Sequence, residues 1–468
     1  MAEQRGYGYD GVIVGSGALA REAALRLTAD QSRRVAVVAA RSPGSLVGSS
    51  ALGLMRASAA QGGAAWGARW GWGTGLKDGE MPPLEGVQGR SQLLHEREFS
   101  TDDWAIAAAA GADVVLCEGE TSARFERDRR GWPVLRAGDR QFKSRHYLLV
   151  EDAPWAEPTV PRFEDLPWMT PDDPTQRLLM APIARDRPNR WLVVGGTPEA
   201  VTLALALARL GSAVTLAVAG SALIPTLADE LERPARSLLT AAGVTIALGS
   251  PVIHGQRIQG QPWVQVGAIA LAVDAVLWAT GRQPRDRWNL AALGVTVSPE
   301  GIAADRHLRT AHPALRVAGS LLGGWGNDTV TQAELTTAIA PLLGQPIPPM
   351  DYGLVPQVIA TDPPLAQVGH TVATARRVWS DRVRIYRQDL SRTLQSADRD
   401  RGMGWRLLIC GPGDRLLGAC AFGSDAPAWV DAIAIALGQG LRLQDLGPFP
   451  WMQAGAPPRS PGQRAGVS

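Results

Sequence analysis

The fold of this chain is decided by the stretch Gly11-Val12-Ile13-Val14-Gly15-Ser16-Gly17-Ala18-Leu19-Ala20. Its first four residues are uncharged and apolar and predict a buried strand, and the glycines after them predict a tight turn. A helical run then continues to about Thr28, and Val35-Ala36-Val37-Val38 predicts a second strand. A strand, glycine turn, helix and strand within about 30 residues form the unit that builds a parallel sheet.

Three small residues give this turn a chemical interpretation. Gly15 permits the tight turn, Gly17 lets the backbone approach a pyrophosphate, and Ala20 lets the helix pack closely on the strand. The phosphates would lie at the helix N-terminus, where backbone N–H groups point outward. Glycine turns also connect strands and helices in proteins that bind no nucleotide. The position of this turn, directly after the strand, favours nucleotide binding.

A second unit of the same design begins at Trp191. It runs through Trp191-Leu192-Val193-Val194, then Gly195-Gly196-Thr197-Pro198-Glu199-Ala200, a helix to Arg209 and a strand at 214–218. Two such units imply two nucleotide-binding modules. In the second turn Thr197 stands where the middle glycine is expected, and its Cβ would crowd a pyrophosphate. Nucleotide binding and a bare structural scaffold therefore both stay open for this unit.

Neither unit carries the carboxylate that usually holds the adenosine ribose at the end of the second strand. The first unit ends Val38-Ala39-Ala40 and the second ends Ala217-Val218-Ala219. Arg41 is either a partner for a 2′-phosphate or a solvated surface arginine. Both predicted sites therefore lack a carboxylate that could bind the adenosine ribose.

Composition narrows the class of protein further. The chain has 468 residues, 45% of them hydrophobic, with 47 basic and 45 acidic side chains. That length is enough for two or three domains, each with its own hydrophobic core. The near-neutral charge balance gives no excess of basic residues that would indicate nucleic-acid binding. The two lysines, Lys77 and Lys143, lie in no P-loop motif and offer little for Schiff-base chemistry. Three cysteines without a C-x-x-C spacing argue against a zinc site and a secreted disulfide scaffold.

The termini and the histidines add further expectations. Residues 1–9 lack the basic and then apolar pattern of a signal peptide, and every apolar segment is interrupted by Arg, Gly or Pro. We therefore expect a cytoplasmic protein without a membrane or nucleic-acid partner. The six histidines lack ligand spacing, so no metal site is predicted.

A third stretch, at residues 274–284, makes the chain resemble a known family. It ends Ala279-Thr280-Gly281-Arg282-Gln283-Pro284 and is followed later by Val317-Ala318-Gly319. With the two glycine units and the C-terminal landmarks Val355-Pro356 and Thr361-Asp362-Pro363, these pieces occur in the order typical of pyridine nucleotide-disulfide oxidoreductases. Dihydrolipoamide dehydrogenase, mercuric reductase, glutathione reductase and soluble transhydrogenase belong to that class.

The resemblance implies an α/β fold with two Rossmann-like dinucleotide-binding domains and a C-terminal α+β dimerisation domain. The implied FAD-binding domain takes residues 1–155 and 277–345, and the NAD(P)-binding domain takes residues 156–276. The dimerisation domain takes residues 350–456, and residues 457–468 are expected to be a disordered tail. FAD and NAD(P) are the implied cofactors, and a homodimer is the implied assembly.

The chain departs from the family at its reactive positions. The class carries a C-x-x-x-x-C pair after the first unit, but residues 42–60 hold no cysteine, and Ser45 and Ser50 align with the two sulfur positions. The C-terminal His-Pro-x-x-x-Glu reads Phe449-Pro450-Trp451-Met452-Gln453-Ala454, and the flavin-binding Ala-Gly-Asp ends in Ser320. An earlier A-T-G reads Val150-Glu151-Asp152. A hydroxyl cannot shuttle between dithiol and disulfide, so the sequence predicts that the family's signature reaction is lost.

Two functions fit this pattern. The first is a flavoenzyme that passes electrons from NAD(P)H through FAD to a quinone, oxygen or a nucleotide. The second is a catalytically inactive paralogue that acts as a binding or regulatory protein. No catalytic residue is assigned in either case. The cofactor-binding candidates are Gly15, Gly17 and Ala20 for the FAD pyrophosphate, Thr280, Gly281, Gly319 and Ser320 near the flavin, and Gly195, Gly196 and Ala200 for NAD(P).

Overall fold

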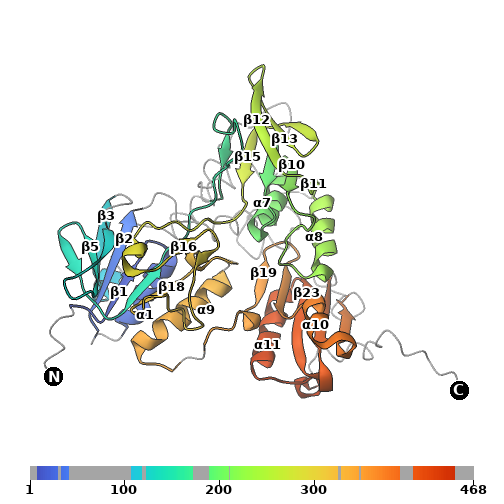
Figure 1. Ribbon diagram of the computed structural model, residues 1–468. Coiled ribbons are helices and arrows are strands. Elements are labelled where there is room, and N and C mark those ends of the chain that lie inside the picture. The colour runs from blue at the N-terminus through green and yellow to red at the C-terminus, as the bar shows by residue number, and fades with distance from the viewer. Residues whose placement is uncertain are drawn as a thin grey trace, which may run out of the picture.

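The computed structural model describes residues 8–29, 33–41, 107–118, 123–171, 189–209, 211–324, 328–346, 349–390 and 404–447. In Figure 1 the first module lies at the left, the second at the top and the C-terminal domain at the lower right. The predictions for Ser45, Ser50, the segment 449–454 and the tail 457–468 lie outside the described residues.

The first module is built on a five-stranded parallel sheet. Its strand order is β18-β7-β1-β2-β3, with β1 Gly11–Val14, β2 Val35–Arg41, β3 Asp113–Glu118, β7 Tyr147–Val150 and β18 Leu315–Ala318. The helices α1 (Ala18–Thr28) and α9 (Asp328–Ile339) pack on one face of this sheet. The other face is covered by the antiparallel sheet β4 Ala123–Arg127, β5 Pro133–Ala137 and β6 Arg140–Phe142, together with the short helix η2 Leu290–Leu293.

The second module repeats this design. Its parallel sheet has the order β11-β10-β9-β15-β8, with β8 Trp168–Met169, β9 Arg190–Val194, β10 Ala213–Val218, β11 Thr245–Leu248 and β15 Ala275–Trp278. The helices are α7 (Pro198–Arg209) and α8 (Asp229–Ala241), and a hairpin sheet is formed by β12 Val252–Ile258, β13 Gln261–Val266 and β14 Ile269–Ala272. Because β15 ends at Trp278, the second sheet continues two residues past the boundary expected at 276.

The C-terminal domain is an antiparallel sheet with helices. Its strand order is β19-β20-β23-β22-β21, with β19 Gln357–Ile359, β20 Leu365–Gly369, β21 Arg384–Asp389, β22 Gly404–Cys410 and β23 Leu416–Gly423. Its helices are α10 (Val372–Trp379) and α11 (Ala426–Gly438). The remaining short elements are β16 Val297–Ser298, β17 Gly301–Ile302, η3 Ser320–Leu322, η4 Ala340–Leu343, η5 Tyr352–Leu354, η6 Ser380–Arg382, η9 Pro412–Asp414 and η10 Leu443–Leu446.

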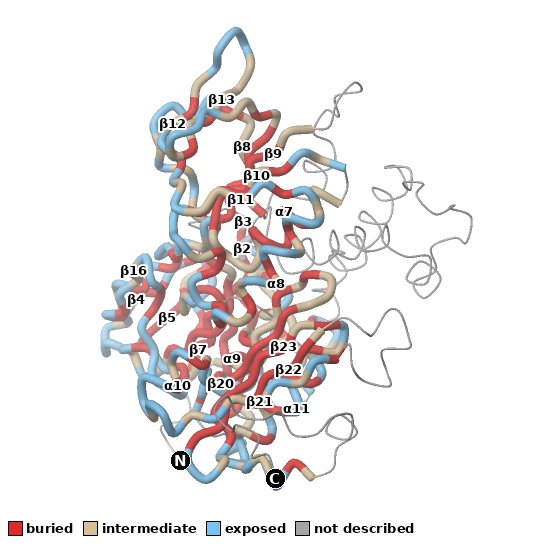
Figure 2. The backbone as a smooth tube through the Cα atoms, turned by 90° about the vertical axis from the view of Figure 1, so that its right-hand side faces the viewer, coloured by how far each residue is buried: buried red, intermediate tan, exposed pale blue. Residues whose placement is uncertain are grey.

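The second module and the C-terminal domain share one hydrophobic core. Leu231 and Leu239 of α8 belong to the same buried cluster as Leu407 of β22 and Cys420 of β23. Figure 2 shows the buried strands β22 and β23 as a continuous red band, with exposed segments at the periphery. Gln367 adds polar contacts, because its Oε1 accepts from Ala228 N at 2.7 Å and its Nε2 donates to the Thr226 carbonyl at 3.0 Å. This shared core fixes the second module on the C-terminal sheet.

Candidate functional site

The glycine turn after β1 lies at the carboxyl edge of the first sheet. The chain reverses its direction of strand addition between β1 and β7, and ligands of open α/β sheets bind at such a switch point. Gly15 has a φ of 145°, and a Cβ there would lie 1.9 Å from the Val150 carbonyl oxygen. Only glycine fits at this position, because the turn predicted from the sequence packs directly against the end of the neighbouring strand β7.

The N-terminus of α1 presents an open anion cradle. Gly17 is the N-cap residue, no side chain caps the helix, and its first turn holds no acidic residue. The Ser16 Oγ is buried and has no hydrogen-bond partner, while Ala20, in the first turn of α1, is fully buried. Uncapped N–H groups, the positive end of the helix dipole and an unsatisfied hydroxyl together suit a pyrophosphate. The residues present here fit the FAD that the family implies.

The other first-module candidates, Gly319 and Ser320, follow β18 at the same edge. The Ser320 Oγ accepts from Ala153 N at 2.8 Å and donates to Asp152 Oδ1 at 3.3 Å. The serine hydroxyl thus holds the segment that leaves β7. Gly319 has a φ of 93°, and its N–H donates to Glu334 Oε2 at 2.8 Å.

Glu334 is a buried carboxyl that sequence reasoning did not single out. It comes from α9, is only 2% exposed, and its Oε1 accepts from the Tyr352 hydroxyl at 2.9 Å. Burial raises the pKa of Glu334 to about 7, against the smaller opposing effect of the hydrogen bonds from Gly319 and Tyr352. The pKa of Tyr352 is raised as well, first by burial and then by the charge of Glu334. This carboxyl links the Gly319 turn to the start of the C-terminal domain.

Glu151, in the segment that replaces the family's A-T-G, forms a buried ion pair. Its Oε1 lies 3.2 Å from Arg287 Nη1, and its Oε2 accepts from Trp288 Nε1 at 2.5 Å. The Glu151 side chain is 5% exposed and that of Arg287 is 14% exposed. Since unpairing a buried charge is costly, this pair anchors the end of β7 behind the Gly15 turn.

The glycine turn of the second module has the same backbone but a different chemistry. Gly195 has a φ of 140°, and a Cβ there would lie 2.0 Å from the Ala279 carbonyl oxygen. Gly196 is packed less tightly, since a Cβ there would lie 2.9 Å from Val218 Cγ1. Thr197 Oγ1 donates to the Ala279 carbonyl at 3.0 Å and accepts from Ala200 N at 3.1 Å.

The N-terminus of α7 is therefore capped by its own chain. Thr197 satisfies the Ala200 N–H, Pro198 has no N–H to offer, and Glu199 places a carboxyl in the first turn. Burial raises the pKa of Glu199, against hydrogen bonds from its own N–H and Thr197 and the charge of Arg282. A dinucleotide that binds here must compete with Thr197 for the Ala200 N–H. The second cradle fits NAD(P) less well than the first fits FAD.

Thr280 and Gly281 lie after β15, at the carboxyl edge of the second sheet. The Gly281 carbonyl accepts from Ala156 N at 2.9 Å, so this turn lies against the segment that connects the two modules. Arg282 next to it donates to the Ala153 carbonyl and stacks over the Trp155 ring at 5.0 Å. The segment from Thr280 to Arg282 therefore contacts the chain that leads out of the first module.

All three cysteines are buried and none faces another. Cys117 lies in β3 of the first module, while Cys410 and Cys420 lie on opposite faces of the C-terminal sheet. Cys420 pairs with Leu407, three residues from Cys410 along β22, which corresponds to about 10 Å. A disulfide requires Cα atoms closer than about 7 Å. Burial raises the pKa of Cys410 to about 12, which keeps the thiol protonated.

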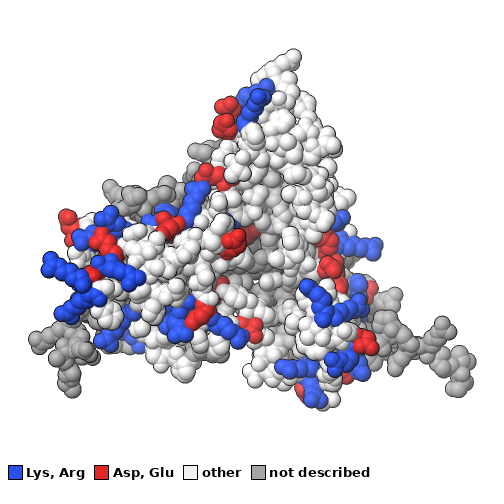
Figure 3. All heavy atoms as spheres, in the orientation of Figure 1, with Lys and Arg blue, Asp and Glu red and all other residues white. Residues whose placement is uncertain are grey.

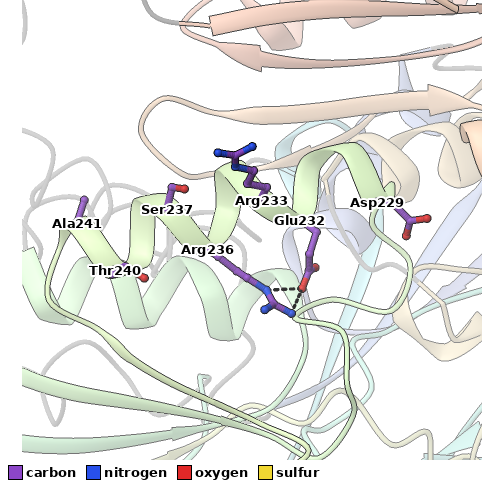
Figure 4. Close-up of a pocket in the computed structure, with 7 residues that line it drawn as sticks. All are labelled: Asp229, Glu232, Arg233, Arg236, Ser237, Thr240 and Ala241. Atoms are coloured by element: carbon purple, nitrogen blue, oxygen red, sulfur yellow. Dashed lines mark hydrogen bonds and ion pairs between the residues drawn. The ribbon is translucent and has the colours of Figure 1, made fainter.

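A cavity along α8 and another at the amino-terminal edge of the first sheet lie away from the glycine turns. One of about 720 Å³ runs along α8, where Arg236 binds Glu232 at 2.8 Å (Figure 4). On the face drawn in Figure 3, acidic and basic side chains are interspersed and the lobe with β12 and β13 carries little charge. Among the described residues, no His, Cys, Asp and Glu side chains gather as a metal site, and no helix has the length and apolarity to cross a membrane.

Family models match both parts of the chain. The model described as pyridine nucleotide-disulphide oxidoreductase matches residues 9–337, and the model of that family's dimerisation domain matches residues 355–450.

Curated relatives agree with this match. A mercuric reductase of Acidithiobacillus ferrooxidans is 27% identical over 390 residues, which cover 80% of this chain and 68% of that protein. A glutathione reductase of Burkholderia cepacia is 30% identical over 256 residues, 53% of this chain and 56% of that protein. A mercuric reductase of Shigella flexneri is 27% identical over 377 residues, 78% of this chain and 65% of that protein. The chain thus spans between 56% and 68% of the length of these relatives.

Solved structures share the fold. The HOCl-induced flavoprotein disulfide reductase RclA from Escherichia coli is similar with a TM-score of 0.76 at 20% identity, covering 94% of this chain and 95% of that one. A Cu(II) complex of a cysteine-to-serine mutant of RclA gives a TM-score of 0.77 at 20% identity and the same coverage. The chain belongs to the pyridine nucleotide-disulphide oxidoreductase family, whose members are FAD- and NAD(P)-dependent oxidoreductases.

Proposed function

We propose that this chain passes electrons from NAD(P)H through FAD to an acceptor other than a disulfide. The observation that carries this proposal is the placement of the cysteines. The chain has three, all buried in strands, and none lies in a position to pair with another. Without a dithiol, the relay that names the family has no sulfur atoms to use.

The open cradle at α1 supports flavin binding. In this proposal Gly15 and Gly17 let the backbone approach the FAD pyrophosphate, Ser16 donates its hydroxyl to it, and Ala20 keeps the helix close to the sheet. FAD held by these residues would supply two-electron chemistry, with a reduced nicotinamide as the hydride donor. Glu334 holds the Gly319 turn beside the cradle through the Gly319 N–H. We propose the same roles as from the sequence for the other candidates: Thr280 and Gly281 near the flavin, and Gly195, Gly196 and Ala200 near NAD(P).

The self-capped α7 favours a second candidate, an inactive paralogue. Thr197 and Glu199 would weaken the binding of a pyridine nucleotide, and a chain that binds none would act as a binding or regulatory protein. An enzyme that binds its nucleotide weakly still works where the nucleotide concentration is high. The capped helix therefore lowers the expected affinity for NAD(P) but does not exclude the oxidoreductase function. We retain the oxidoreductase as the proposal.

The remaining expectations stay part of the proposal. The domain boundaries are those given above, with the second sheet extended to Trp278, and the domain at 355–450 is proposed to pair two chains as a homodimer. Three free, buried cysteines suit a reducing compartment, and we propose the cytoplasm.

The acceptor is tested by steady-state NADH and NADPH oxidation with 1,4-benzoquinone, oxygen or glutathione disulfide. The proposal expects turnover with the quinone or oxygen, and none with the disulfide. A variant with all three cysteines replaced, Cys117→Ala, Cys410→Ala and Cys420→Ala, should keep the same turnover per bound FAD. Loss of turnover in a folded, flavin-loaded triple variant would contradict the proposal. A colourless protein that takes up no FAD would favour the inactive paralogue.

A further inference from the structure

A buried arginine in the first module has two guanidinium nitrogens without a hydrogen-bond partner. Arg316 of β18 is 8% exposed, and its Nε and Nη1 are buried without a hydrogen-bond partner. Among the described residues it forms no ion pair within 4.0 Å. Burial lowers the pKa of Arg316, the charge of Arg309 lowers it further, and the carboxylate of Asp305 opposes them with a smaller effect. A buried guanidinium with unsatisfied nitrogens destabilises the fold, and Asp305 offsets its charge only in part, so a bound anion on this side of the sheet would stabilise it.

The direction of the side chain follows from strand alternation. Leu315 and Val317 belong to the core cluster on one face of the sheet, so Arg316 between them faces the other side, which α1 and α9 cover. His146 lies two residues before Leu148, a member of the helix-covered core, and alternation places it on the same side. The charge of Arg316 acts on His146, whose pKa is lowered first by burial and then by Arg316 and Arg145.

His146 opens into a cavity at the amino-terminal edge of the sheet. The cavity has a volume of about 530 Å³ and is lined by His146, Arg33, Arg34, Arg145 and Asp10, with Leu342 of η4 against its floor at Gly11. Three arginines and one carboxylate give the lining a net positive charge. The His146 Nδ1 is buried and has no hydrogen-bond partner. This edge is opposite to the carboxyl edge that holds the Gly15 turn, so the cavity is separate from the dinucleotide cradle.

The wall of the cavity is held in place by hydrogen bonds. Arg33 Nη2 donates to the Leu343 carbonyl at 3.2 Å, which fixes this guanidinium against η4. Asp10 Oδ2 accepts from the backbone N–H of Arg34 at 2.8 Å. The guanidinium of Arg34 stacks over the Tyr9 ring at 5.6 Å. These contacts position the cations at the cavity, and planar guanidinium groups suit the oxygens of a phosphate or sulfate.

We propose that this cavity binds a small tetrahedral oxyanion, either free phosphate or the phosphate of a small monoester. His146 and the lining arginines contact the anion, and Arg316 supplies positive charge from within the core. The volume exceeds that of a bare phosphate ion, which leaves room for a small organic group. The bound anion would add negative charge on the side of the sheet that Arg316 faces.

The test uses the purified full-length protein as isolated. Isothermal titration with inorganic phosphate, and separately with glycerol 3-phosphate, is carried out at constant ionic strength set by potassium chloride. Saturable binding of one anion per chain is expected in at least one arm, and the tighter arm identifies the source. Absence of saturable binding in both arms would overturn the proposal.

Arg316→Met gives the second readout. Removing a buried charge that is only partly offset should raise the thermal midpoint of the anion-free protein, and it should weaken phosphate binding by about tenfold or more. Arg145→Met at the cavity wall should weaken binding and leave the anion-free midpoint unchanged. Arg377→Met, on the exposed surface of α10, removes one charge elsewhere and is the matched control. If Arg316→Met lowers the midpoint and binds phosphate as the parent chain does, Arg316 has a structural role and the proposal is wrong.

Discussion

Replacing Glu334 with Gln isolates the cost of burying a carboxylate beneath the Gly319 turn. Glu334 is 2% exposed and accepts from Gly319 N at 2.8 Å and from the Tyr352 hydroxyl at 2.9 Å. A glutamine keeps an oxygen for the Gly319 N–H and places its amide nitrogen at the Tyr352 oxygen. The substitution therefore removes the ionisable proton and leaves the shape of the side chain unchanged.

The magnitude follows from the pKa of Glu334, which burial raises from 4.5 to about 7. Because the folded-state pKa lies above the unfolded-state value, the native protein binds the proton more tightly than the unfolded chain does. This stabilisation is complete below pH 4.5, declines as the pH rises towards 7 and is absent above it. The full difference corresponds to ~3 kcal/mol in the free energy of unfolding.

The assay is urea denaturation at pH 5 and pH 8, followed by circular dichroism. Between these two pH values the parent chain should lose about 2.5 kcal/mol more stability than Glu334→Gln does, so the variant is the more stable protein at pH 8. Glu164→Gln, at an exposed position, controls for the loss of one carboxylate. Identical pH profiles for the parent chain and Glu334→Gln would refute the reasoning.

Three further predictions concern the two glycine turns. Ser16→Asp should abolish FAD binding because it places a carboxylate in the open cradle of α1, whereas Ser16→Ala should retain flavin; absorbance at saturating FAD separates them. Thr197→Gly should tighten NADH or NADPH binding by about tenfold, because it frees the Ala200 N–H; an unchanged Kd by fluorescence titration would show that Thr197 is no obstacle. Gly15→Ala should destabilise the chain by more than about 3 kcal/mol, while Gly220→Ala, with open space around it, should not; thermal denaturation measures both.

Most of the fold could be predicted from the sequence because it is encoded locally. The run from Gly11 to Ala20 contains a strand, a turn that requires glycine and the start of a helix, and α1 ends at Thr28 as expected. The same holds for the second unit, where α7 ends at Arg209. The α+β domain that the resemblance implies for residues 350–456 contains the antiparallel strands β21, β22 and β23.

The chemistry of the site was only partly accessible from sequence. Thr197 was recognised as an obstacle by its Cβ, but its role as a cap depends on the Ala279 carbonyl, 82 positions away. Glu151 accepts a hydrogen bond from Trp288, 137 positions away in the sequence. No periodic pattern in the sequence predicts such a contact. In α9, Glu334 is an acidic residue among mostly uncharged neighbours. An acidic residue in such a segment was the one sequence signal that pointed to a buried carboxyl. Contacts between distant segments depend on the packed fold.

The central claim is electron transfer through FAD without a dithiol, and an anaerobic reductive titration tests it most directly. The purified protein, with FAD bound, is titrated with dithionite while the flavin absorbance is followed. Two electrons per FAD should complete the reduction, because the flavin accepts two and no disulfide is present to accept more. NADH or NADPH should then bleach the same flavin band. Uptake of four electrons per FAD would reveal a redox-active disulfide and contradict the account.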